Sequence, residues 1–139
     1  MLRTISAFVV LLLSAQATSA AELRVQIDGI TQPSGTLSAM LVNSADAWDG
    51  KAPPVSGRRA DITATGPIEM IFDGLAPGDY AIRLMHDEDG NGKLDQNLVG
   101  MPTEGYGFSN NPRVMRAATF EEARFTVPEA GTAIQIVLR

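Results

Sequence analysis

The chain has 139 residues, of which 45% are hydrophobic and 19% are charged, and it contains no cysteine. A chain of this length has room for one compact domain, since domains mostly contain about 50 to 250 residues. Sixteen acidic residues outnumber eleven lysines and arginines and give a net charge of −5. This balance argues against a surface that binds the phosphates of DNA or RNA. The lack of cysteine excludes disulfide bonds and thiolate metal sites.

The N-terminus has the pattern of a secretory signal peptide. One positive charge, Arg3, precedes an apolar run over residues 5–13, and small residues follow it, with Thr18-Ser19-Ala20 as the expected cleavage site. A membrane anchor is the alternative, but the run is shorter than the roughly 18 to 20 residues that a span needs. We therefore expect residues 1–20 to be removed. Residues 21–139 would then form a single periplasmic or secreted domain without a membrane span.

Apolar residues in the remaining chain alternate with a period of two, which is typical of half-buried strands. The alternating sets are Leu23, Val25 and Ile27; Leu37, Ala39 and Leu41; Ile68, Met70 and Phe72; Tyr80, Ile82 and Leu84; Ala123, Phe125 and Val127; and Ile134, Ile136 and Leu138. Glycine and proline turns separate them, and only residues 44–48 favour a helical turn. The pattern predicts an all-β fold: an antiparallel β-sandwich of the immunoglobulin or prealbumin type with roughly six to eight strands.

Two long connections interrupt the strands, over residues 44–57 and from residue 87 to about residue 119, and the second begins with the spacing of an EF-hand-type calcium loop. Oxygen-bearing side chains occupy its first, third, fifth and ninth positions and glycine its sixth. These residues are Asp87, Asp89, Asn91, Asp95 and Gly92. Lys93, at the seventh position, is expected to offer its carbonyl oxygen. Calcium takes six to eight oxygens, and the glycine permits the bend that wraps the chain around the ion. We therefore expect one Ca²⁺ here.

The loop departs from the EF-hand at its end. The twelfth position, normally a bidentate glutamate, is Leu98, so Glu104 is expected to fold back and complete the shell. The flanks also lack helices, because a strand pattern precedes the loop and Gly100-Met101-Pro102 follows it. A long calcium-loop-like connection on a β-sandwich is the better description. The alternative is a solvated turn, since Asp, Asn and Gly are favoured in turns.

Three segments make the chain similar to a known family. They are Phe72 to Ile82 (FDGLAPGDYAI), His86 to Asp95 (HDEDGNGKLD) and Gly100 to Asn111 (GMPTEGYGFSNN). The chain resembles, over nearly its whole mature length, the bacterial secreted family catalogued as domain of unknown function 2141. The first segment is also typical of prealbumin-like and carboxypeptidase-regulatory-like sandwiches. The resemblance implies secretion and a β-sandwich and, since the family brings no established activity, it implies no reaction.

The residues leave two function classes open. The preferred one is a non-catalytic, calcium-stabilised module that binds a protein, a glycan or an envelope component, with Tyr106 and Phe108 presented beside the ion. These aromatic residues could equally tuck into the edge of the sandwich. The alternative is a small extracytoplasmic hydrolase that uses His86 and the acidic loop. Burial of His86 beneath the loop would favour the module, whereas exposure in a pocket with two carboxylates would favour the enzyme.

Overall fold

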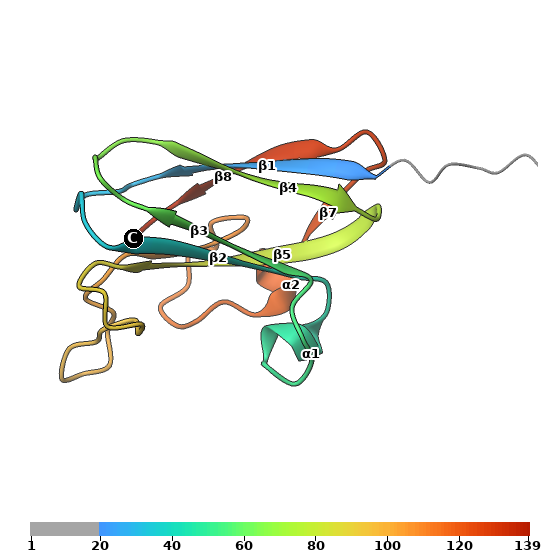
Figure 1. Cartoon of the computed structure of the whole chain (residues 1–139). Coiled ribbons are helices and arrows are strands. Elements are labelled where there is room, and N and C mark those ends of the chain that lie inside the picture. The colour runs from blue at the N-terminus through green and yellow to red at the C-terminus, as the bar shows by residue number, and fades with distance from the viewer. Residues whose placement is uncertain (1–19) are drawn as a thin grey trace, which may run out of the picture.

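The computed structural model describes residues 20–139, so the expected signal peptide lies outside the described residues except for Ala20. Strands dominate the described part (Figure 1), which confirms the prediction of an all-β fold. The elements are β1 (Ala21–Asp28), β2 (Thr36–Val42), α1 (Ala45–Trp48), β3 (Ser56–Asp61), β4 (Ile68–Leu75), β5 (Gly78–Asp87), β6 (Tyr106–Phe108), α2 (Phe120–Ala123), β7 (Phe125–Val127) and β8 (Thr132–Val137). Neither helix is long and apolar enough to cross a membrane.

The strands form two sheets that face each other (Figure 1). One sheet has the order β4-β1-β8, and the other has the order β3-β2-β5-β6, with β7 also paired to β5. The expectation of purely antiparallel pairing is wrong for one pair, because β8 runs parallel to β1, with Leu23 opposite Thr132. The reason is the path of the chain. A short turn carries it from β7, on one sheet, to β8 on the other, so β8 does not return as a hairpin.

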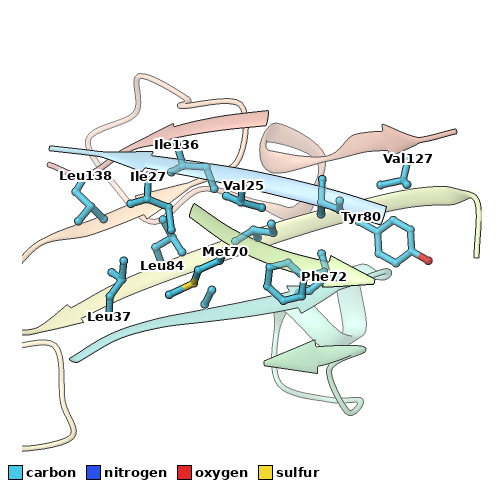
Figure 2. Close-up of a cluster of buried hydrophobic side chains, with 14 of the residues drawn as sticks. Val25, Ile27, Leu37, Met70, Phe72, Tyr80, Leu84, Val127, Ile136 and Leu138 are labelled. Carbon is cyan, nitrogen blue, oxygen red and sulfur yellow. The ribbon is translucent and has the colours of Figure 1, made fainter. Parts of the chain in front are cut away.

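The core lies between the sheets and explains the period of two in the sequence. Leu23, Val25 and Ile27 on β1 are fully buried. Val25 and Ile27 face Leu37, Leu84 and other side chains of the opposite sheet (Figure 2). Burial of each large apolar side chain contributes about 1.5–3 kcal/mol relative to exposure. A second cluster covers part of the outer face of the larger sheet. It contains Val42, Ala47, Trp48, Ala81, Ala118, Phe120 and Ala123.

Strand β3 was not predicted, because its sequence Ser-Gly-Arg-Arg-Ala-Asp lacks alternating apolar residues. It lies at an edge of its sheet, where half of its side chains remain in solvent. Arg58 closes this edge of the core. Its guanidinium lies 5.2 Å from the ring centre of Phe72 and its Nε donates to the carbonyl of Ile71 at 3.1 Å. Edge strands tolerate such polar sequences, which blunt unwanted pairing.

Helix α2 is also absent from the prediction, which placed Ala123 in a strand. Thr119 caps its start: the threonine hydroxyl accepts from the Glu122 N–H at 3.3 Å, and the Glu122 carboxylate accepts from the Thr119 N–H at 2.9 Å. The Thr-Phe-Glu-Glu sequence carries this capping-box pattern and could have indicated a helix start. The strand therefore begins only at Phe125.

The segment that follows β6 fastens this strand to the rest of the fold. The hydroxyl of Ser109, which is fully buried, accepts from the Ile82 N–H at 2.9 Å and donates to the Ala123 carbonyl. Asn111 has a positive φ of 47° and bonds through its side chain to two backbone groups of β8, those of Gln135 and Val137. Asparagine tolerates this left-handed conformation better than most residues. The hydrogen bonds of Ser109 and Asn111 thus give the Ser-Asn-Asn motif a structural role in the fold.

Ser109→Ala is expected to destabilise the fold by about 2 kcal/mol, because it leaves a buried donor and a buried acceptor without partners. Urea denaturation of the wild type and the variant measures this difference. Ser38→Ala serves as the control, because Ser38 is half-buried on β2 and its hydroxyl makes no hydrogen bond within the described residues. Equal stability of Ser109→Ala and the wild type would contradict this role.

Candidate metal centre

The acidic loop leaves the end of β5, where the turn between β1 and β2 holds it in place. The Nε2 atom of His86 lies 2.7 Å from the Ser34 carbonyl oxygen, and the Ser34 hydroxyl donates to the Glu88 carbonyl at 3.1 Å. Gly35 packs directly against the backbone of Asp87: a Cβ on Gly35 would overlap the Asp87 carbonyl oxygen. Residues 86–88, which include the first residue of the predicted loop, are thus held by three contacts with a turn distant in sequence.

The structure brings three carboxylates together in this loop. Asp87, Asp89 and Glu104 each offer an oxygen, and these oxygens all lie within 4.8 Å of one another. Asp87 and Glu104 are buried, at 7% and 6% exposure, while Asp89 faces solvent. Two oxygens that share a calcium ion at about 2.3–2.6 Å lie no more than about 5 Å apart. The three side chains are therefore within the separation that one ion requires.

Glu104 lies at the point where the two ends of the loop converge. One of its oxygens accepts from the N–H groups of Glu88 at 3.1 Å and Asp89 at 3.4 Å, and the other accepts from the N–H of Asp95 at 2.9 Å. A carboxylate has about four lone-pair sites, so these three bonds leave capacity for a further partner. They also fix the side chain in a single orientation toward Asp87 and Asp89.

Asp87 is oriented in the same way by the turn that follows it. Its Oδ1 accepts from the Asn91 N–H at 3.1 Å and its Oδ2 from the Gly92 N–H at 2.7 Å. Gly92 has a φ of +78°, a conformation that glycine adopts without strain. This turn bends the chain back over the first carboxylate, as the calcium-loop spacing predicts.

The other predicted ligands, Asn91, Lys93 and Asp95, do not belong to the group of three carboxylates but lie next to it. The side-chain nitrogen of Asn91 donates to Asp95 Oδ1 at 2.6 Å and to Asp89 Oδ2 at 3.3 Å, and its oxygen accepts from the Lys93 N–H at 2.8 Å. The amide nitrogen of Asn91 thus faces the acids, and a half-turn of the amide would be needed to present its oxygen. Asp95 adjoins the cluster through this amide, and Lys93 lies on the exposed rim.

The crowding of the acids shows in their pKa values. Hydrogen bonding with Asp95 raises the pKa of Asp89 to about 6, and the charges of Asp95 and Glu104 act in the same direction. The hydrogen bond from Asn91 lowers the pKa of Asp95. Carboxylates held this close repel one another when all are ionised. A bound cation would relieve that repulsion.

Between Asp95 and Glu104 the chain forms a protruding loop, which we call the finger. A bridge joins Gln96 to Pro102, and the Asn97 side chain accepts from the Val99 and Met101 N–H groups, both at 3.0 Å. Leu98, the residue at the twelfth loop position, lies fully exposed on this finger. The chain therefore turns away at the position where an EF-hand has its glutamate, and it returns to the cluster at Glu104.

His86 is buried, at 1% exposure, and its Nδ1 lies 3.8 Å from a Glu88 oxygen. It also lines a hollow of about 230 Å³ together with Glu88 and Glu104. The burial agrees with the prediction for a binding module, while the neighbouring carboxylates agree with the prediction for an enzyme. No serine hydroxyl in the described residues bonds to His86. Its contact with the Ser34 carbonyl makes it a positioning residue for the loop.

Tyr106 and Phe108 lie on β6 and are half-buried. Their ring centres are 5.8 Å apart, and Phe108 lies at the same distance from Trp48. Between them Gly107 points inward, where a Cβ would approach a methyl group of Ile136 to 3.0 Å. The two aromatic residues line a hollow of about 340 Å³ beside the base of the finger. The two aromatic side chains are therefore neither fully exposed beside the acidic cluster nor fully buried in the edge of the sandwich.

Comparison with known proteins yields one match. The family model described as "Uncharacterized protein conserved in bacteria (DUF2141)" matches residues 25–135. None of the curated proteins and none of the solved structures compared with the chain matches it.

Proposed function

This chain belongs to the DUF2141 family, and we propose that it is a non-catalytic, secreted or periplasmic module that calcium stabilises and that binds a protein, a glycan or another component of the cell envelope. The proposal includes a β-sandwich of the immunoglobulin or prealbumin type and a signal peptide over residues 1–20. The observation that carries it is the approach of the Asp87, Asp89 and Glu104 oxygens to within 4.8 Å.

The donor set favours calcium among common ions. All three gathered donors are carboxylate oxygens, which suit hard cations, and no histidine or cysteine is among them. Magnesium needs near-ideal octahedral geometry at about 2.0–2.1 Å and usually keeps several waters, whereas calcium accepts irregular loops. Asn91 and Asp95, next to the cluster, would add further oxygens after a rotation of the Asn91 amide.

The ion would act as a staple. Asp87 belongs to the end of β5, Asp89 to the loop, and Glu104 precedes β6 by two residues. One cation would therefore join β5, the acidic loop and the segment that leads into β6, which carries Tyr106 and Phe108. A chain without disulfide bonds gains stability in this way, because an ion that binds only the folded state shifts the folding equilibrium.

The hydrolase remains the second candidate, because His86 shares its hollow with Glu88 and Glu104. The module is preferred, because the Nε2 atom of His86 is committed to the Ser34 carbonyl in a buried position. A general base must reach the proton that it abstracts. Hydrolysis of model esters or phosphoesters that disappears in His86→Gln would favour the enzyme.

Glu104→Gln tests the staple. The variant keeps an oxygen that accepts hydrogen bonds but loses the negative charge, so the dissociation constant for calcium is expected to rise about tenfold or more, equivalent to about 1.4 kcal/mol. Calcium should also slow proteolysis of the finger in the wild type and much less in the variant. Glu129→Gln removes the same charge from the distant β7–β8 turn and is expected to bind like the wild type. If Glu104→Gln keeps wild-type affinity and protection, the staple is wrong.

A further inference from the structure

We propose that the outer face of the larger sheet binds an organic carboxylate with an apolar body, with Arg59 and Arg83 holding its charge. The inference rests on the proposed binding function and names the chemistry of the ligand. This face is distinct from the acidic cluster, although β5 contributes to both.

The register of the strands determines which side chains lie next to one another on this face. Two neighbouring cross-strand rows point away from the core, since the residues between them, such as Ala39 and Leu84, are buried. The first row is Arg59, Ser38, Met85 and Tyr106, and the second is Gly57, Met40, Arg83 and Phe108. Neighbouring strands lie about 4.8 Å apart, so each row spans roughly 14 Å. The face thus combines two guanidinium groups with two methionines and two aromatic rings.

A hollow of about 580 Å³ lies over β3, β2 and β5 on this face. Its lining includes Arg59, Arg83, Met40 and Met85, and it contains no acidic residue. Gly57 opens it, because this residue has no side chain between Met40 and the edge of the sheet. Volumes of about 300–1,000 Å³ are usual for small-molecule sites, and unbranched methionines adapt to varied apolar shapes.

Within the part of the chain that the structure describes, the charge of Arg83 has no carboxylate at ion-pair distance. Its guanidinium stacks 4.5 Å from the Trp48 ring centre and donates one hydrogen bond, to the Trp48 carbonyl at 2.8 Å. Burial lowers the pKa of Arg83, although the charge of Asp49 opposes this, and Asp49 itself lies 3.8 Å from Lys51. A guanidinium has five N–H donors. One of these donors is bonded within residues 20–139, which leaves others for an anion.

Arg59 is the second anchor. It is exposed, and within residues 20–139 its guanidinium makes neither an ion pair nor a side-chain hydrogen bond. Other surface arginines do pair, for example Arg24 with Glu22 and Arg116 with Glu122. Planar guanidinium groups match the two oxygens of a carboxylate. Arg58 also borders the hollow, but its guanidinium bonds to the Ile71 and Gly57 carbonyls and lies 3.9 Å from Asp73. Since Arg59 and Arg83 are the two that lack a carboxylate partner within residues 20–139, a head with one negative charge fits the hollow better than a doubly charged phosphate.

Titration with decanoate in the presence of a chelator tests the inference. Saturable amide shifts along β2, β3 and β5 are expected by NMR, with at least tenfold weaker binding of decanol. Arg59→Gln should weaken decanoate binding about tenfold. Arg24→Gln, on the other sheet, removes the same group and should have no effect. Equal binding of decanol, equal effects of the two variants, or tighter binding of decyl phosphate than of decanoate would overturn the proposal.

Gly57→Leu provides a second variant that preserves the fold. A Cβ at this position would meet only the Ala39 carbonyl oxygen, at 3.7 Å, so a leucine can fill the hollow without strain. Loss of decanoate binding is expected, and retention would contradict the site. Asp87→Asn should bind decanoate like the wild type. Calcium binding without decanoate binding would therefore defeat this inference alone, and the reverse result would defeat the calcium-binding function alone.

Discussion

Calcium at about 100 times its dissociation constant is expected to raise the free energy of unfolding by roughly 2.7 kcal/mol, because it binds only the folded chain. For a domain of this size, that gain corresponds to an increase in melting temperature of about 10 °C. The dissociation constant itself should be on the order of 10⁻⁴ to 10⁻³ M, as for other extracellular calcium modules. Thermal unfolding of residues 21–139, with calcium and with chelator, measures the increase.

Asp87→Asn should abolish this increase. The variant keeps a side-chain oxygen that can accept the Asn91 N–H or the Gly92 N–H, but it loses the charge. Asp73→Asn is the matched control, because Asp73 is exposed on β4 and lies on the opposite sheet. If all three proteins melt at the same temperature with and without calcium, the loop is only a turn.

Gly35→Ala is expected to destabilise the fold by about 3 kcal/mol or more. Gly35 has a φ of +74°, and its added Cβ would overlap the Asp87 carbonyl oxygen and lie 2.8 Å from the Glu88 Cα. No rotation of a side chain can relieve an overlap with backbone, so the turn and the loop must separate. Because the overlap pushes on Asp87, calcium affinity should fall as well. Denaturant unfolding and calcium titration measure the two effects.

Gly50→Ala separates strain from overlap. Gly50 has a φ of +77°, close to that of Gly35, but nothing lies within 4 Å of an added Cβ. This variant should lose only the cost of a left-handed alanine, about 1 kcal/mol, and should bind calcium normally. Equal losses in the two variants would show that the β1–β2 turn does not support the acidic loop.

The strands that cross the core could be predicted from the sequence, because one face of each is buried. In β1, Leu23, Val25 and Ile27 are fully buried while the residues between them are not, which produces the period of two. The same logic failed for β3, where Arg58 faces the core edge and Arg59 faces solvent, so apolar alternation is absent. Pairing of an edge strand depends on its neighbour more than on its own composition.

The acidic cluster was partly predictable. The missing acid at Leu98 suggested that Glu104 would fold back, and the structure places it beside Asp87 and Asp89. Neither the finger nor the orientation of the Asn91 amide follows from spacing, because both depend on hydrogen bonds between side chains and backbone N–H groups of the folded loop. The binding of calcium stays a prediction.

The outer face with Arg59 and Arg83 was out of reach of sequence reasoning. These two residues lie on different strands, with Ser38 and Met40 of β2 between them. Their rows exist only through the register of strands that are far apart in the chain. Nothing in the Arg58-Arg59 pair itself shows that its two side chains point to opposite faces of a sheet.

The central claim is that calcium binds at one site in the acidic loop. An NMR titration with calcium, after a chelator has removed bound metal from the mature chain, tests it most directly, because the titration both locates and measures binding. The account predicts one saturable site, with the largest amide shifts at Asn91, Gly92 and Asp95, whose N–H groups bond to the cluster, and no such shifts in Asp87→Asn. Shifts that fail to saturate, or that spread equally over distant acids such as Glu69 and Asp73, would contradict it.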